Sequence, residues 1–270
     1  MYIKNEKHRR VIQEEYRVLK MEVFMNSISN KKGLTANALK IIAIIAMTLD
    51  HIAAKFISPD ILIYQLFRAI GRLTIVIMCY MVVEGYHHTR DIKKYLVRMF
   101  LFAIISHVPF VFMNTGRVSL FFGKGNFQTS VMWPLFLGLV TLCIWNSNKV
   151  TYLQKVIFLV LICLLAIPGD WNMLAVIWIW GFDLYYEDKK MKMKFFGSVA
   201  LAMALSITIL YIVNDIQQWY KEIFHFGLLA AIPVLSRYNG KPGRAKSMKW
   251  FFYIYYPLHM VILGLLAYKL

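Results

Sequence analysis

Long apolar blocks recur along this chain of 270 residues, and they restrict its fold more than any other feature. Nine segments can be marked, at residues 38-57, 62-83, 95-113, 130-146, 152-167, 172-186, 195-213, 222-236 and 250-268. An α-helix rises about 1.5 Å per residue, so about 20 residues cross a hydrocarbon layer about 30 Å thick. Several blocks reach that length. The sequence therefore predicts an all-α fold, a polytopic transmembrane bundle of about nine helices.

The composition excludes a water-soluble fold. Hydrophobic residues make up 59% of the chain and charged residues 17%, whereas soluble domains are about half apolar and a quarter charged. The net charge of +17 comes from short basic clusters between the apolar blocks, not from one basic face. We therefore expect membrane lipids as partners, and no nucleic acid.

The basic residues also predict an orientation. Clusters of lysine and arginine fall in the N-terminal arm and the even-numbered connections, whereas the opposite connections carry only Arg117, Lys124 and Lys221. Because cytoplasmic loops are enriched in lysine and arginine, the N-terminus is predicted to be cytoplasmic and the C-terminus outside.

Two domain segments are predicted. Residues 1-36 form a polar, basic arm without the apolar core of a signal peptide, and residues 37-270 form a single transmembrane domain. Short connections such as 168-170 read as helix-ending turns. The longest outer connection, residues 114-128, can re-enter the membrane or lie at the interface, and an interfacial loop is predicted.

Ionisable residues inside apolar segments are costly and therefore candidates for function. Asp50 and His51 lie in the outer half of the first helix, about 100° apart around it, so each needs a partner from another helix. Arg68 and Arg72 are four residues apart, share one face of the second helix, and lie at a matching depth. An ion pair that only joins two helices and a functional group both remain open for these residues.

Two further histidines, His107 in the third helix and His259 in the ninth, fall near the middle of the bilayer. A single transmembrane histidine is as often a hydrogen-bonded structural residue as a reactive one, but three beside two arginines favour function. An imidazole can act as general base while an arginine stabilises an oxyanion, which together suit acyl transfer.

Two polar stretches are predicted on the cytoplasmic side. Residues 84-90 form a polar run that can line a cytoplasmic mouth or be a solvated helix end. Residues 237-244 form a basic, glycine-rich loop that can bind the phosphates of a donor such as coenzyme A, although an ordinary basic cytoplasmic loop explains it equally well.

No metal is expected. The adjacent pair His87 and His88 is poorly spaced for one ion, and no His-Glu-x-x-His motif occurs. The three cysteines lie inside apolar runs without the spacing of a zinc site or a disulfide framework.

Several stretches resemble the TraX family of conjugal-transfer proteins, which has a pilin acetylase member. They are Leu39-Lys40-Ile41-Ile42-Ala43 through Leu49-Asp50-His51-Ile52, Gly71-Arg72-Leu73, Glu84-Gly85-Tyr86-His87-His88-Thr89-Arg90, Lys94-Tyr95-Leu96 through Ser106-His107-Val108-Pro109-Phe110, Tyr238-Asn239-Gly240-Lys241-Pro242-Gly243 and Phe252-Tyr253-Ile254-Tyr255-Tyr256-Pro257-Leu258-His259. The resemblance implies a multi-pass protein of the bacterial plasma membrane, similar to the broader membrane acyltransferases.

The leading hypothesis is a membrane acetyltransferase that uses acetyl-CoA as acyl donor and a peptide or surface polymer as acceptor. The expected catalytic residues are His51 as the base, assisted by Asp50, with Arg72 and Arg68 at the oxyanion, and His259. Substrate binding is expected at Glu84, His87, His107 and Tyr256, and donor binding at Arg90, Arg237, Lys241 and Arg244. The alternative is a proton-coupled transporter or a structural component of a conjugation or secretion apparatus. The sequence does not fix the acceptor or the oligomeric state.

Overall fold

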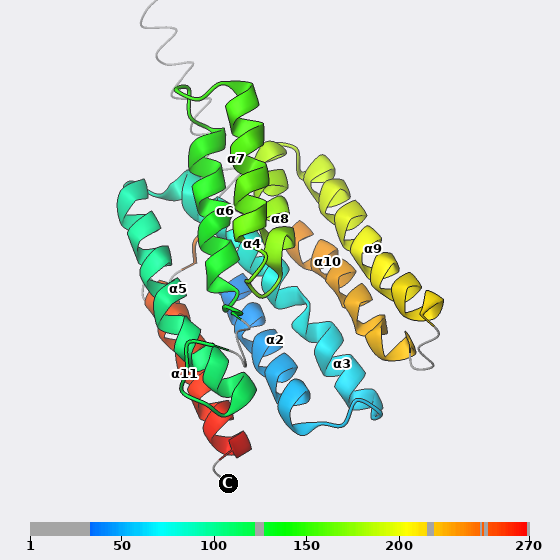
Figure 1. Ribbon diagram of the computed structural model, residues 1–270. Helices are drawn as coiled ribbons and strands as arrows, with labels where there is room; N and C mark the ends of the chain where they lie inside the picture. The colour runs from blue at the N-terminus through cyan, green and yellow to red at the C-terminus, as the bar shows by residue number, and fades with distance from the viewer. Residues whose placement is uncertain (1–32, 122–126, 215–218, 244, 246–247, 269–270) are drawn as a thin grey trace, which may run out of the picture.

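The helices follow the apolar blocks closely. The computed structural model describes residues 33–121, 127–214, 219–243, 245 and 248–268, and in that part of the chain the only β pairing is two isolated bridges. The described residues form nine helical segments (Figure 1), which are α2 Ala36–Phe56, α3 Leu62–Gly71 continued by α4 Leu73–His88, α5 Ile92–Thr115, α6 Met132–Trp145, α7 Tyr152–Leu165, α8 Asn172–Leu184, α9 Lys189–Val213, the 3-10 helix η1 Trp219–Ala230 continued by α10 Ala231–Ser236, and α11 Met248–Tyr268. The all-α prediction is confirmed. Of the predicted arm, residues 1–32 lie outside the described residues.

The outer surface of these helices is apolar. Four helical stretches are long and apolar enough to cross a membrane: Leu62–His88, Ile92–Thr115, Lys189–Val213 and Trp250–Tyr268. On α7, Leu153, Leu161 and Leu164 are each about half exposed or more. Soluble proteins rarely expose so large a continuous apolar surface, so these helices are those of a membrane protein.

The helices meet at two ends of the bundle. At the first, called the Asn114 end, α2, α5 and α11 finish together: Tyr268 donates to the Asn114 carbonyl (2.8 Å) and Lys55 donates to the same oxygen (3.5 Å). At the opposite end, called the Glu84 end, the Tyr238 hydroxyl donates to the Glu84 carboxylate (3.0 Å), and the chain entering α2 pairs with the chain leaving α10. The described chain thus begins at the Glu84 end and finishes at the Asn114 end. The cytoplasmic location of the Glu84 end remains a prediction.

Three helices are too short to cross a membrane alone. α6, α7 and α8 have 14, 14 and 13 residues, which is about 20 Å each, and they stand together in the upper part of Figure 1. They connect the Glu84 end with the middle of the bundle. The turn between α7 and α8 therefore lies inside the protein.

The connection that leads into α6 also ends inside the protein. The amide of Thr129 donates to the Pro168 carbonyl (2.7 Å), and the amide of Asp170 donates to the Thr129 carbonyl (2.9 Å). These bonds satisfy backbone groups that would be costly to bury unpaired. The interfacial position of residues 114-128 stays a prediction, and their last residue, Gln128, is exposed and lines a cavity.

The helix starts are set by local chemistry. Thr35 caps α2 by accepting from the Ala38 amide, and Asp91 caps α5 by accepting from the Lys94 amide (3.0 Å). This backbone hydrogen bond lowers the pKa of Asp91 below its ordinary value of 3.8. In the core, Trp178 and Phe182 of α8 are fully buried.

Candidate functional site

Asp50 is held by two arginines from the neighbouring helix. Arg68 Nη1 lies 2.9 Å and Arg72 Nη2 lies 2.8 Å from the same carboxylate oxygen, Oδ1. The four-residue spacing in the sequence predicted that both guanidinium groups share one face, and the structure confirms it. One carboxylate therefore lies between two cations, which leaves a net positive charge on this trio.

Gly71 makes this close approach possible. A Cβ atom at this position would lie 2.3 Å from Asp50 Cβ, closer than atoms of neighbouring side chains can come. The Arg72 guanidinium, which is buried, also stacks over the rings of Trp171 (4.9 Å) and Phe224 (5.0 Å). Such cation–π contacts restrain its orientation.

His51 pairs with His259 of the last helix. His51 Nδ1 lies 2.8 Å from His259 Nε2, with the two ring planes only 6° apart. His259 Nδ1 lies 3.0 Å from the Tyr255 carbonyl oxygen, which can only accept, so Nδ1 of a neutral His259 carries the hydrogen. Its Nε2 then accepts, and His51 Nδ1 donates to it. This order leaves Nε2 of His51 with a free lone pair, and it has no hydrogen-bond partner among the described residues.

A second contact supports the same pair of helices one turn away. The Thr48 hydroxyl donates to the Ile44 carbonyl (2.8 Å), so the Tyr255 hydroxyl is the donor in its 2.7 Å bond to Thr48. This hydrogen bond joins α2 to α11 beside the histidines. The two ends of the domain thus meet at one site.

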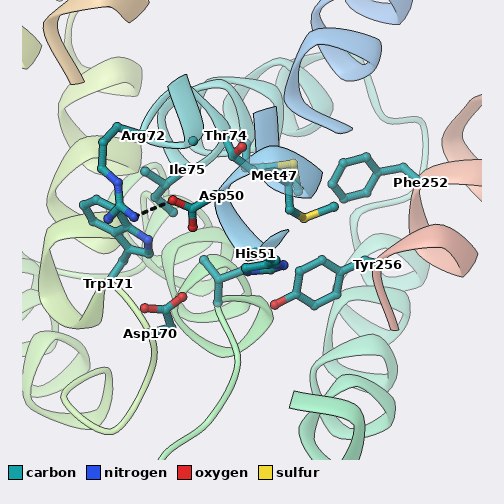
Figure 2. A pocket seen from close by; sticks show the side chains of 13 residues that line it. Met47, Asp50, His51, Arg72, Thr74, Ile75, Asp170, Trp171, Phe252 and Tyr256 are labelled. Carbon is teal, nitrogen blue, oxygen red and sulfur yellow. Dashed lines mark hydrogen bonds and ion pairs between the residues drawn. The ribbon is translucent and has the colours of Figure 1, made fainter. Parts of the chain in front are cut away.

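A small cavity, called the Asp50 cavity, lies between these groups. Its volume is about 40 Å³, and Asp50, His51, Arg72, Asp170 and Tyr256 are among the residues that line it. Figure 2 shows their side chains arranged around this space. A space of this size holds a few water molecules or a group as small as acetyl.

Two larger cavities adjoin it on opposite sides. The Asn114 cavity, about 300 Å³, shares Asp50 and four other lining residues with it and extends to Asn114. The Arg98 cavity, about 150 Å³, shares Met78 and Phe252 with it and is lined by Arg98 near the start of α5. Spaces therefore lead from the Asp50 cavity toward both ends of the bundle.

Three of the predicted site residues lie elsewhere. The Nε2 atom of His107 in α5 bonds to the Leu120 carbonyl (2.9 Å). Among the described residues, His51 bonds to His259 and not to His107. His87 bonds to Asp183 of α8 (2.7 Å), and Glu84 accepts from Tyr238. The contact of His87 joins α4 to α8, whereas His107 and Glu84 bond to residues of connecting segments.

The predicted donor-binding residues stand at the Glu84 end. Arg90 and Arg237 are exposed, Lys241 is half-buried, and Arg244 lies outside the described residues. The chain around Lys241 is tied to the start of α2, since the Ala36 amide donates to the Lys241 carbonyl (2.8 Å). None of those that the structure describes lines the Asp50, Asn114 or Arg98 cavity.

Three site residues were not predicted from the sequence. Asp170 and Trp171 come from the turn between α7 and α8, and Phe224 comes from η1. The Asp170 side chain is exposed to the cavity and makes no ion pair with a described residue. The sequence carries one signal for Asp170. It is an acidic residue between two apolar segments that are too short to cross a membrane, so it lies within the membrane and not at its surface.

The described residues offer no group of three or more histidine, cysteine, aspartate or glutamate side chains arranged to hold a metal ion. The three cysteines are free thiols. The polar chemistry of this site therefore rests on imidazole, guanidinium and carboxylate groups.

Comparisons with known proteins identify a family for this chain. The family model described as TraX protein matches residues 35–267. A relative named "Probable fimbrial assembly protein FimC, serogroup H1", from Dichelobacter nodosus, is 29% identical over 242 residues, which cover 87% of this chain and 97% of the relative. No solved structure matches. Because the family model covers the whole described bundle, the chain belongs to the TraX family.

Proposed function

We propose that this protein is a membrane-bound acyltransferase, which moves a short acyl group such as acetyl from acetyl-CoA to an amine or hydroxyl of a peptide or cell-surface acceptor. One observation carries the proposal. The bond from His51 to His259 leaves Nε2 of His51 as a proton acceptor, in a residue that lines both the Asp50 cavity and the adjoining Asn114 cavity.

The proton balance of the reaction fits this tautomer. The acceptor oxygen or nitrogen attacks the thioester carbonyl while Nε2 of His51 takes its proton. The tetrahedral intermediate then collapses, the carbon–sulfur bond breaks, and the proton passes from His51 to the sulfur. The products are the acylated acceptor and free coenzyme A. His259 accepts the Nδ1 hydrogen of His51 throughout, so it acts as a positioning residue.

The guanidinium groups supply the positive charge. The guanidinium groups of Arg68 and Arg72 are held at Asp50 beside the cavity, so their N–H donors can stabilise the oxyanion that forms on the acyl carbonyl. Stacking of Arg72 on Trp171 and Phe224 keeps that group in place before the substrate arrives. Asp50 serves here by orienting the arginines and not by contacting His51, which differs from the role expected from the sequence.

The two larger cavities suit the two substrates. The Arg98 cavity is lined mainly by apolar side chains, including Met78 and Phe252, and has a cation at Arg98. A pantetheine arm with an anionic end matches that lining. The Asn114 cavity is more polar and includes Lys55 and Asp170, which suits an acceptor with an amine or hydroxyl.

A thiol-release measurement tests the proposal. Purified protein in nanodiscs, with acetyl-CoA and a peptide carrying a free N-terminal amine or a glycan carrying hydroxyls, is expected to release free coenzyme A. His51→Ala should lower turnover by at least about 100-fold, the usual contribution of a general base. The matched control is His88→Ala, which changes an exposed histidine at the Glu84 end. Equal turnover in the His51→Ala and wild-type proteins would refute the base assignment.

A second candidate function is a structural role in assembling a surface appendage. The relative from Dichelobacter nodosus is named a probable fimbrial assembly protein, and the pairing of Asp50 with Arg68 and Arg72 also joins α2 to α3. Under this reading a folded His51→Ala protein supports assembly normally and coenzyme A release is absent. Loss of assembly in that variant favours the acyltransferase.

A further inference from the structure

An apolar groove with a basic end lies on the outer side of the bundle, away from the Asp50 cavity. Its volume is about 820 Å³, and it runs between α9 and the segment formed by η1 and α10. Lys189, Lys190 and Lys194 line it at the start of α9. Leu201, Leu229 and Ile232 continue its wall. We name it the Lys190 groove.

The basic end has no acidic counterpart within the lining. Lys190 and Lys194 are exposed, are four residues apart and so share one helix face, and form no ion pair with a described residue. Lys189 donates to the Ser236 carbonyl of α10, which closes the end of the groove. The nearest acidic side chain in the sequence, Asp188, accepts from the amides of Lys190 and Met191.

The groove has the depth of one membrane leaflet. From Lys190 to Leu201 the helix rises about 16 Å, half of a hydrocarbon core about 30 Å thick. α9 is one of the four stretches able to cross a membrane, and only 17% of its most apolar window is buried. The lysines therefore lie at the membrane surface while Leu201 reaches toward the bilayer centre.

Gly197 lies in the wall of the groove, where α9 comes close to α10. A Cβ atom there would lie 3.2 Å from Cδ1 of Ile232 across the groove. A larger side chain at this position would fill the space that an acyl chain needs. The groove thus combines a cationic end, a lipid-facing position and an apolar channel one leaflet long.

We propose that the Lys190 groove binds an anionic phospholipid, with its phosphate between Lys190 and Lys194 and one acyl chain along Gly197 and Leu201. Clustered lysines at a membrane surface attract anionic headgroups, and the apolar wall accounts for a lipid in preference to a free anion. This inference does not depend on acyl transfer at His51.

Native mass spectrometry tests it. Wild-type protein released from nanodiscs of equal parts phosphatidylglycerol and phosphatidylcholine should retain one phosphatidylglycerol molecule. The double change Lys190→Gln with Lys194→Gln should reduce that retention about tenfold. The control is Lys93→Gln with Lys94→Gln, which removes two exposed lysines from the first turn of α5. Equal retention in the two double variants would overturn the proposal.

Two further experiments distinguish a bound phospholipid from a free phosphate ion. Gly197→Trp should block retention, whereas Ala202→Trp, at an exposed position of α9 outside the groove, should not. Inorganic phosphate at millimolar concentration should fail to displace the lipid. Displacement by phosphate alone, or retention of phosphatidylcholine in place of phosphatidylglycerol, would contradict an anionic lipid site. If Gly197→Trp does not fold, the lysine variants still decide the question.

Discussion

His51 Nδ1 lies 2.8 Å from His259 Nε2, although 208 residues separate them in the chain. The Tyr255 carbonyl fixes the hydrogen of His259 on Nδ1, and this in turn fixes the hydrogen of His51 on Nδ1. A backbone group of α11 thus determines which nitrogen of α2 is free to accept a proton.

Changing His259 should therefore impair turnover without removing the base. His259→Phe removes the acceptor for His51 Nδ1, so we expect a loss of about 10-fold to 100-fold in kcat, the size found for groups that orient a metal-bound histidine. His259→Gln, whose side-chain oxygen can still accept, should recover part of the loss. The measurement is coenzyme A release across a pH series. A merely structural role for His259 would leave the shape of the pH profile unchanged and would give no recovery with glutamine.

Asp50→Asn should destabilise the protein strongly, because it leaves two guanidinium groups with no carboxylate between them. Removing one partner of a buried ion pair costs about 3 kcal/mol or more. The midpoint temperature of thermal unfolding in detergent measures the effect. Asp60→Asn is the control, since it breaks an exposed pair with Lys221 and such pairs contribute little. Equal midpoints for the two variants would show that the Asp50 carboxylate is not needed for the fold.

Gly71→Ala should displace Asp50 from the arginines. The added Cβ would lie 2.3 Å from Asp50 Cβ, and overpacking of this kind costs about 1–3 kcal/mol. Gly197→Ala is a suitable comparison, because its Cβ meets only the flexible end of Ile232 at 3.2 Å. We expect a lower thermal midpoint for Gly71→Ala alone. An equal thermal midpoint for Gly71→Ala and the wild type would show that the packing of α2 against α3 tolerates a Cβ atom at this position.

The link between Asp60 and Lys221 predicts a small pH dependence. The hydrogen bond from Lys221 lowers the pKa of Asp60 below its ordinary value of 3.8. A lowered pKa means that the stabilisation is present above about pH 4 and is lost as pH falls through the pKa of the folded state. Wild type should therefore have a slightly higher thermal midpoint than Asp60→Asn at pH 7, and this difference should shrink as the pH falls below about 4. High salt should reduce the difference at pH 7. A difference that stays the same size from pH 7 to pH 3 would contradict this account.

The small Asp50 cavity predicts selectivity for short acyl donors, a consequence of the proposed function. Its volume is about 40 Å³, and Met78 lies between it and the Arg98 cavity. We expect coenzyme A release with acetyl-CoA and little with butyryl-CoA. Met78→Ala should raise butyryl transfer relative to acetyl transfer, while Met203→Ala, on α9, should not change the ratio. An unchanged ratio in Met78→Ala would place the acyl group elsewhere.

Part of the site was predictable because helix geometry converts sequence spacing into position. Arg68 and Arg72 had to share a face of their helix, and Asp50 lay at the same depth on the preceding one, so their pairing followed from two local rules. His107 shows where this reasoning fails. It lies at a similar depth, yet the rotation of α5 directs it to the Leu120 carbonyl.

Asp170 and Trp171 were missed for a related reason. Both sit in a turn, and turns of membrane proteins are expected at the membrane surface. The short lengths of α7 and α8 bring this turn into the middle of the bundle, where its amides bond to the chain before α6. Helix length was visible in the sequence, but the partner for those backbone groups was not.

The sequence by itself determined that this chain forms membrane-spanning helices and how deep its charged residues lie, because the rise of a helix and the thickness of the hydrocarbon layer link position in the chain to depth. Only the tertiary structure decided which residues meet. The depth of a residue does not determine how its helix is rotated or which helices lie beside it. Both depend on packing between segments that are far apart in the chain. The bond from His51 to His259 and the position of Asp170 beside Arg72 in the Asp50 cavity arise at that level.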